Sequence, residues 1–166
     1  MESLKELYRV GPGPSSSHTL AVKRICECFL ERYPDCDEYH VDLYGSLALT
    51  GKGRMSDRII ENTLGKDRTD VVFRKEWIDD MANTMVIQCP KGEMTFYSIG
   101  GGAFLIKGEE TKVDRNVYPE NSMDEITAFC ETEEIDLAQY VCLREPDIMG
   151  FLDGILKSMF KSVKRG

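Results

Sequence analysis

The sequence predicts an α+β fold in which helices pack on one face of a mostly antiparallel sheet, followed by a C-terminal helical extension. In residues 16–33 the apolar side chains recur at three- and four-residue steps, which is typical of an amphipathic helix. Residues 84–89 and 93–99 read as strands and flank the turn sequence Pro-Lys-Gly, which is typical of a β-hairpin. The composition changes after residue 118, so we expect one domain over residues 1–118 and a helical extension over residues 119–166.

The first elements of the chain alternate between helix and strand. Residues 3–8 are expected to form a short helical turn, and Pro34 ends the first long helix because proline cannot continue it. Apolar and polar residues alternate over residues 39–44, as in a half-buried strand, and His40 lies on the polar face as a solvated side chain. A serine–aspartate pair at residues 56–57 can cap a second helix.

The middle of the chain is rich in β-forming residues. We expect short strands over residues 71–73 and 103–106, on either side of the hairpin, and a helix around residues 75–81. Three consecutive glycines, residues 100–102, interrupt the last two strands. Glycine in a strand marks a bulge, a tight bend or a close backbone approach, so these residues are either a bend or a ligand contact.

The C-terminal part is predicted to be helical. Residues 122–125 form a capping-box pattern that opens one helix, Asp136 opens another, and a last helix follows Pro146. Residues 148–163 of this last helix carry a long apolar stripe. Such a stripe must pack somewhere: on the sheet, on another chain, or on a domain that this chain lacks.

Composition excludes several classes of function. The chain of 166 residues is 42% hydrophobic and 30% charged, as in a globular protein that can bury a core. Its formal net charge of −8 argues against a general nucleic-acid binder. We see no apolar leader and no stretch long enough to span a membrane, so we expect a cytoplasmic protein.

The six cysteines are expected to be thiols, because disulfides are rare in the cytosol. None of them forms a C-x-x-C pair, and Cys26 and Cys28 point to different faces of the predicted first helix. We therefore predict no metal site made from the residues of this chain.

The stretch of residues 11–19, Gly-Pro-Gly-Pro-Ser-Ser-Ser-His-Thr, lies just before the first long helix. Its prolines prevent an early helix start, and its serines can accept hydrogen bonds from the free N–H groups of the first turn. Such a helix start attracts anions, so the stretch is either a plain capped helix start or an anion-binding loop that carries His18.

A second glycine-containing stretch follows the strand at residues 39–44. Gly51 and Gly53 bracket Lys52, and Arg54 comes next. Glycine lets a backbone approach a ligand closely, but the order of residues is not that of a phosphate-binding Walker A loop. Lys52 and Arg54 are either surface cations or contacts to a ligand.

These three stretches resemble the β domain of the iron–sulfur-dependent L-serine dehydratases, or L-serine ammonia-lyases. The resemblance rests on residues 13–19, residues 44–53 and residues 97–102, in this order and with sensible spacing. Residues 125–130 and 148–166 in addition resemble the opening helices of the family's catalytic α domain. On this resemblance the chain looks like a β domain with the start of an α domain, as a fragment or as one half of a split enzyme.

The resemblance implies a lyase of amino acid metabolism and gluconeogenesis that converts L-serine to pyruvate and ammonia. The family uses a 4Fe-4S cluster instead of pyridoxal phosphate, with cluster ligands in the α domain and none in this chain. The resemblance further implies that His18 is a proton carrier or an orienting donor. It also implies that the substrate meets the side chains of Ser15, Ser16, Ser17, Thr19, Lys52 and Arg54 and the backbone of Gly51, Gly53, Gly100, Gly101 and Gly102. The expected partners are L-serine, an α domain or subunit, and further copies of the chain, with no nucleic acid and no membrane.

The sequence departs from the family pattern at two places. Family members usually carry a histidine directly after the Gly-Lys-Gly turn, where this chain has Arg54, which cannot act as a base at neutral pH. They also tend to have Gly-Pro shortly after the His-Thr pair, where this chain has Leu-Ala-Val at residues 20–22.

Two other functions fit the same residues. In one, the loop binds an amino acid or another anion as a sensing, regulatory domain without catalysis, because the family's β domain is similar in fold to an allosteric domain of some phosphoglycerate dehydrogenases. In the other, the chain is an assembly domain whose apolar stripe, residues 148–163, docks a partner.

Overall fold

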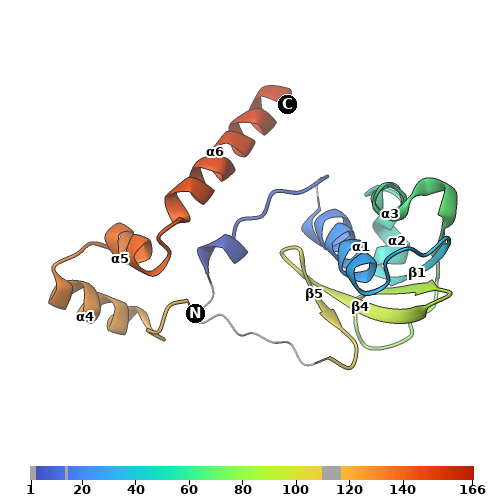
Figure 1. Cartoon of the computed structure of the whole chain (residues 1–166), viewed down its shortest axis with the longest axis horizontal. Coiled ribbons are helices and arrows are strands. Elements are labelled where there is room, and N and C mark those ends of the chain that lie inside the picture. Colours follow the sequence, from blue (N-terminus) through green and yellow to red (C-terminus); the bar gives the residue numbers. More distant parts are fainter. Residues whose placement is uncertain (1–2, 14, 110–116) are drawn as a thin grey trace. The chain divides into compact units, whose positions relative to one another are not determined.

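The computed structural model describes residues 3–13, 15–109 and 117–166. Two compact units can be distinguished: Gly11–Thr111, and Met1–Val10 together with Lys112–Gly166 (Figure 1). Each unit has an apolar core of its own. The units are groups of contacting residues, and the division into domains 1–118 and 119–166 stays a prediction.

The first unit is built on a five-stranded sheet with the strand order β2-β1-β3-β4-β5. Strand β1 pairs in parallel with β2, and every other neighbouring pair is antiparallel. The strands are β1 (Tyr39–Gly45), β2 (Thr69–Phe73), β3 (Asn83–Cys89), β4 (Gly92–Gly100) and β5 (Ala103–Ile106). The predicted hairpin is confirmed as β3 and β4, with Cys89 opposite Gly92.

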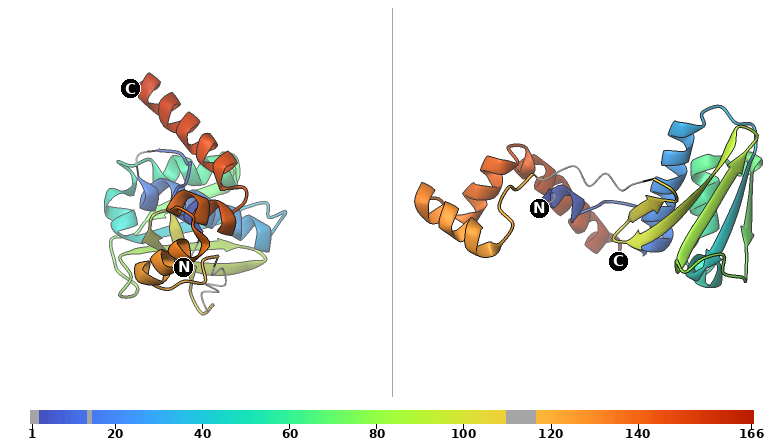
Figure 2. Two further views of the ribbon diagram at one scale, coloured as in Figure 1. Left: turned by 90° about the vertical axis from the view of Figure 1, so that its left-hand side faces the viewer. Right: turned by 90° about the horizontal axis from the view of Figure 1, so that it is seen from below.

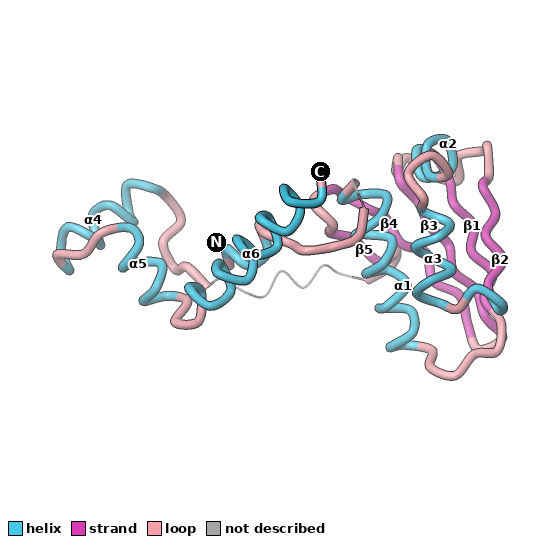
Figure 3. Tube along the Cα trace, turned by 90° about the horizontal axis from the view of Figure 1, so that it is seen from above, coloured by secondary structure: helices cyan, strands magenta, loops and turns pink. Residues whose placement is uncertain are grey.

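Helices α1 (Ala21–Arg32) and α3 (Ser56–Leu64) cover one face of this sheet (Figures 2 and 3). A π-helical turn, Ser16–Leu20, leads into α1, a short helix α2 (Ser46–Gly51) follows β1, and a 3-10 turn (Lys66–Arg68) precedes β2. The buried apolar side chains of α1 and α3 meet those of the central strands, among them Ile25, Phe29, Ile60, Leu64, Val41, Leu43, Met85, Ile87 and Phe96. This arrangement confirms the predicted α+β class.

The second unit is helical. It contains a 3-10 turn (Leu4–Glu6), α4 (Met123–Glu133), α5 (Leu137–Arg144) and α6 (Ile148–Arg165). Its apolar core is formed by Tyr118, Ile126, Cys130 and Tyr140, with Leu4 packed against it. Ser122 caps α4 by accepting a hydrogen bond from the Glu125 amide, and Asp136 forms a capping box with Gln139 in α5. The three predicted helices of this part are therefore confirmed.

The carboxylate of Glu145 joins the two chain segments of the helical unit. It is 5% exposed and accepts hydrogen bonds from the Ser3 hydroxyl, the Leu4 amide (2.9 Å) and the Tyr118 hydroxyl. Lys5 forms an ion pair with Asp147 beside it. Burial alone would raise the pKa of Glu145, but the hydrogen bonds from Ser3, Tyr118 and Leu4 together hold it below its usual range.

Local predictions fail at three places in the first unit. Residues 75–81 form no helix, because the Asp79 carboxylate accepts hydrogen bonds from the Met81 amide and the Thr84 hydroxyl and so stabilises a turn. The short helix α2 was not expected after β1. Helix α3 begins at Ser56 without a side-chain cap, preceded by Met55 in left-handed conformation.

Within residues 3–13, 15–109 and 117–166, no helix is long and apolar enough to cross a bilayer.

Candidate functional site

The three sequence stretches that carry the family resemblance meet at one end of the sheet. His18 lies in the π-helical turn before α1, Thr50 and Ser56 lie in and after α2, and Ser98 lies near the end of β4. Hydrogen bonds join these elements in pairs, and each bond involves the His18 ring, the His18 carbonyl or the neighbouring Ser17 carbonyl. His18, at 6% exposed, is therefore the centre of the site.

Both ring nitrogens of His18 have hydrogen-bond partners. Nε2 lies 2.9 Å from the Thr50 hydroxyl and 3.2 Å from the Ser46 carbonyl, and Nδ1 lies 3.4 Å from the Ser15 hydroxyl. The Thr50 hydroxyl donates to the Ser46 carbonyl (2.9 Å), so it is left to accept from His18. The hydrogen bonds therefore assign the proton to Nε2 and leave Nδ1, beside Ser15, as the basic nitrogen.

His18 is held in its neutral form. Burial lowers its pKa below the ordinary 6.5, the hydrogen bond to the Ser46 carbonyl opposes this, and the positive charge of Arg54 lowers the pKa further. At neutral pH the side chain is thus a neutral imidazole, in which one ring nitrogen donates and the other accepts.

A sharp turn at Gly45 places helix α2 under His18. Gly45 has φ 58° and ψ −131°, and a Cβ atom there would lie 2.4 Å from the Ala82 carbonyl oxygen. The same carbonyl accepts a hydrogen bond from the Ser46 amide at 2.7 Å. Only glycine fits this close approach, and the turn aims the Ser46 carbonyl and the Thr50 hydroxyl at the histidine ring.

Two serines on other elements donate hydrogen bonds to the backbone of the loop. The fully buried Ser56 hydroxyl, at the start of α3, donates to the His18 carbonyl at 2.8 Å. The Ser98 hydroxyl of β4 donates to the Ser17 carbonyl at 3.1 Å. The loop is thus fixed to the helix layer and to the sheet, and its position does not depend on local helix capping alone.

The serines and the threonine of the loop have different surroundings. Ser15 caps the π-helical turn by accepting from the His18 amide at 3.3 Å. Ser16 is exposed and Ser17 is half-buried, so both side chains are nearer to solvent than the histidine. Thr19 is 1% exposed, and its hydroxyl donates to the Ser15 carbonyl. Ser15, Ser16 and Ser17 therefore form the outer surface of the loop.

The predicted cations and glycines at the end of α2 are neighbours in sequence but differ in solvent exposure. Lys52, Gly53 and Arg54 are exposed, and the Arg54 amide donates to the Gly51 carbonyl at 3.0 Å. Gly51 is buried, and a Cβ atom there would lie 3.1 Å from the Ser56 hydroxyl oxygen. Gly51 thus serves close packing of α2 on α3, while Arg54 is near enough to His18 for its charge to act on the imidazole.

The glycine triplet forms the turn between β4 and β5. Gly100, Gly101 and Gly102 have φ values of 101°, 58° and 80°, all in the region that glycine adopts most easily. The Gly102 carbonyl accepts a hydrogen bond from the Arg24 guanidinium of α1 at 2.8 Å. A tight bend therefore accounts for these glycines, two residues beyond the serine that holds the loop.

Four residues that hold His18 or its loop are absent from the predicted site: Ser46, Thr50, Ser56 and Ser98. All except Ser56 fall in the stretches that carry the resemblance, and their spacing gave no sign of a common target. The sequence predicts Ser56 as a possible helix cap, but in the structure its hydroxyl donates to the His18 carbonyl.

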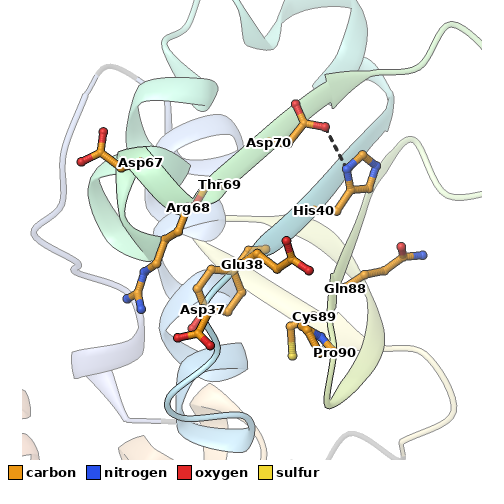
Figure 4. Close-up of a pocket in the computed structure, with 11 residues that line it drawn as sticks. Asp37, Glu38, His40, Asp67, Arg68, Thr69, Asp70, Gln88, Cys89 and Pro90 are labelled. Atoms are coloured by element: carbon orange, nitrogen blue, oxygen red, sulfur yellow. Dashed lines mark ion pairs between the residues drawn. The ribbon is translucent and has the colours of Figure 1, made fainter.

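A cavity of about 880 Å³ lies at the opposite end of the sheet. It surrounds the start of β1 and includes His40, whose Nδ1 lies 3.0 Å from the Asp70 carboxylate (Figure 4). His40 Nε2 also lies 3.3 Å from the Asp42 carboxylate, so the ring is a strand residue between two carboxylates, with 35% of its side chain exposed. This cavity shares no lining residue with the His18 site.

Within the described part of the chain, no three His, Cys, Asp or Glu side chains are grouped so that they could hold a metal ion. The described cysteines are all free thiols. These residues therefore do not fit the role of ligands to an iron–sulfur cluster.

The fold and the site together define a class of protein: an α+β domain with a polar surface of serine hydroxyls beside a neutral, fully hydrogen-bonded histidine. Comparison with known families agrees with this class, since residues 3–67 match the model of the serine dehydratase beta chain. This match supports an L-serine dehydratase beta domain in the chain.

Curated relatives extend the similarity beyond the matched domain. L-serine dehydratase 2 of Escherichia coli (strain K12) is 38% identical over 83% of this chain and 42% of its own length. L-serine dehydratase of Helicobacter pylori (strain ATCC 700392 / 26695) is 24% identical over 97% of this chain and 47% of its own length. The H. pylori alignment covers 212 positions, so in this region the relative has residues that the chain lacks. The chain spans about half the length of the curated relatives it matches.

Proposed function

We propose that this chain is part of an L-serine ammonia-lyase, which converts L-serine to pyruvate and ammonia, and that residues 15–18 form the wall that faces the substrate. The relatives of the chain carry the name L-serine dehydratase. The observation that carries the proposal for the site is the convergence of separate stretches on His18 and its loop through hydrogen bonds with Thr50, Ser56 and Ser98. A structural helix start would not need this support from three elements.

The chemistry of the wall follows from its hydrogen bonds. The hydroxyls of Ser16 and Ser17 can donate to the substrate carboxylate, and the exposed guanidinium of Arg54 can pair with it. His18 receives or returns a proton at Nδ1. The Ser15 hydroxyl, 3.4 Å from Nδ1, lies between the ring and the outer surface of the loop. Thr50 and Ser46 hold the ring in the tautomer that leaves Nδ1 basic.

The remaining parts of the proposed enzyme lie outside this chain. We propose an α domain or subunit as the partner, which supplies a 4Fe-4S cluster in place of pyridoxal phosphate; when bound, the cluster acts as a Lewis acid on the substrate. The exposed apolar residues of α6, among them Met149, Leu156, Met159 and Phe160, are candidates to contact that partner. Assembly into a homo-oligomer and a cytoplasmic location belong to the same proposal.

Reconstitution tests this function. The chain would be co-expressed, with iron and sulfide supplied under exclusion of air, with the part of E. coli L-serine dehydratase 2 that lies beyond the aligned region. Formation of pyruvate from L-serine by the pair, and not by either part alone, is the expected result. A stable, cluster-loaded complex of the two parts that forms no pyruvate would contradict the proposal.

A second candidate is a sensing domain that binds an amino acid or another anion without catalysis. One observation favours it: His18 is buried and both its ring nitrogens already have partners, as expected for a residue that shapes a binding loop. Calorimetric titration of the chain alone with L-serine and with phosphate separates the two. Binding of either ligand to the chain alone supports the sensing function. If the titration produces heat only with the reconstituted pair, the result supports the ammonia-lyase.

A further inference from the structure

Two cysteines that are distant in sequence nearly touch in the folded chain. Cys36 lies in the connection between α1 and β1, Cys89 ends β3, and their sulfur atoms are 2.8 Å apart although 53 positions separate them. A disulfide bond is about 2.05 Å long, so the sulfurs need to move by less than an ångström to bond.

Hydrogen bonds hold the junction around these sulfurs, where the α1–β1 connection with Cys36 meets the end of β3 with Cys89. On one side of the pair, the Lys91 ammonium donates to the Pro34 carbonyl at 2.6 Å. The Arg68 guanidinium donates to the Cys36 carbonyl at 3.0 Å and lies over the Tyr39 ring, 5.2 Å from its centre. These contacts hold the segment of Cys36 against neighbouring parts of the fold. The two sulfurs are therefore close together in the folded state without a rearrangement of the backbone.

The two thiols differ in access to solvent. Cys36 is 2% exposed, whereas Cys89 is half-buried and lines the cavity of about 880 Å³ at this end of the sheet (Figure 4). A small oxidant can therefore reach Cys89 from the cavity, and the buried Cys36 sulfur lies 2.8 Å from that of Cys89. A solvent-accessible thiol beside a second, buried thiol is the arrangement of a redox-sensitive pair.

We propose that Cys36 and Cys89 are a redox-modification site that closes to an intrachain disulfide when the protein meets a peroxide. The Cys89 thiolate attacks one peroxide oxygen and becomes a sulfenic acid, with release of one water. The Cys36 sulfur then displaces the hydroxyl from Cys89 as a second water, and the S–S bond forms. In total, two thiols are oxidised by two electrons, one hydrogen peroxide is reduced, and a thiol reductant reverses the step.

The other cysteines offer a built-in comparison. Cys26 is fully buried in α1, so an oxidant cannot reach it from solvent. Cys28 follows two positions later on the same helix, where the two side chains point to different faces. The disulfide is thus specific to the junction and does not follow from the presence of several thiols.

Peptide mapping tests the proposal on the full chain. The folded protein would be treated with hydrogen peroxide, alkylated without reduction, and digested with trypsin. The expected product is a cross-link between the peptides of residues 33–52 and 76–91, with the loss of two of the six thiols and their return after reduction. The melting temperature of the oxidised protein is expected to rise by roughly 5 °C or more, because the bond closes a long loop.

Variants make the result specific. Cys89→Ser and Cys36→Ser should each abolish this cross-link and the rise in melting temperature, whereas Cys28→Ser, a half-buried control, should keep both. The proposal is overturned if the folded wild-type chain retains all six thiols, or if its cysteines cross-link in other combinations as readily. Mapping of the wild type decides even where a variant fails to fold.

Discussion

At the scale of single residues, the site depends on how His18 is protonated. The Thr50 hydroxyl is engaged as a donor to Ser46, so the histidine ring donates from Nε2 and keeps Nδ1 as an acceptor. Burial and the nearby charge of Arg54 both lower the pKa of His18. A charged imidazolium would therefore lose hydrogen-bond complementarity and face a cation, which makes the neutral ring part of the folded state.

The titration of His18 gives the first prediction. Since its pKa is lowered on folding, the folded state binds fewer protons than the unfolded state as the pH falls below about 6.5. This contribution to stability is present above pH 6.5 and is lost as the pH drops towards the folded pKa. The chain has only two histidines, so NMR titration of their ring protons measures the pKa of His18. The His40→Gln variant assigns the two signals. A His18 signal that titrates above 6.5 would refute the assignment.

The bond from Ser56 to the His18 carbonyl gives the second prediction. Ser56→Ala removes the donor from a buried acceptor, so the free energy of unfolding should fall by about 1–3 kcal/mol. Ser16→Ala, at an exposed serine of the same loop, should change it by less than about 0.5 kcal/mol. Urea unfolding of the two variants checks this, and equal effects would mean that the Ser56 bond does not hold the loop.

At the scale of elements, the turn from β1 into α2 decides where Thr50 lies. Gly45→Ala would put a Cβ atom 2.4 Å from the Ala82 carbonyl oxygen, at a φ of 58° that other residues rarely adopt. We expect a loss of stability of at least about 2 kcal/mol from this contact and strain.

A glycine nearby serves as the control for this variant. Gly53→Ala meets nothing closer than the Thr50 carbonyl oxygen at 3.7 Å, and its stability should be nearly unchanged. Thermal unfolding compares the two variants. A Gly45→Ala protein as stable as the Gly53→Ala protein would show that the turn tolerates a side chain.

The sequence predicted most elements because their signals are local. The hairpin of β3 and β4 follows from its turn residues, and the helical part follows from caps at Ser122 and Asp136. Helix α2 could not be predicted, because it is short and depends on the contact of Gly45 with Ala82. For the same reason the role of Ser56 was out of reach, since a bond to a residue 38 positions away leaves no pattern in sequence.

At the scale of the whole molecule, the residues before and after the sheet unit belong together. Glu145 binds the Ser3 hydroxyl, the Leu4 amide and the Tyr118 hydroxyl, so it ties the first residues to the helical unit. The family match covers residues 3–67, so it includes Ser3 and Leu4 but not Glu145 or Tyr118. The helical unit is thus built from both ends of the described chain.

Removal of this carboxylate gives the fourth prediction. Glu145→Gln keeps the shape but weakens the acceptor, and hydrogen exchange of the Leu4 amide should become faster by at least about tenfold. Since the pKa of Glu145 is lowered on folding, its contribution is present at neutral pH and is lost as the pH falls through the folded pKa. Glu131→Gln, at an exposed position of α4, is the control and should leave exchange unchanged.

The central claim is that His18 faces the substrate of an L-serine ammonia-lyase, and the most direct test compares the two histidines of the chain in the reconstituted enzyme. The measurement is the rate of pyruvate formation from L-serine by His18→Gln and His40→Gln, at a temperature at which both are folded. We predict a fall in kcat of about 100-fold or more for His18→Gln, and a change within about twofold for His40→Gln. Full activity of the His18→Gln enzyme, or an equal loss in both, would contradict the account.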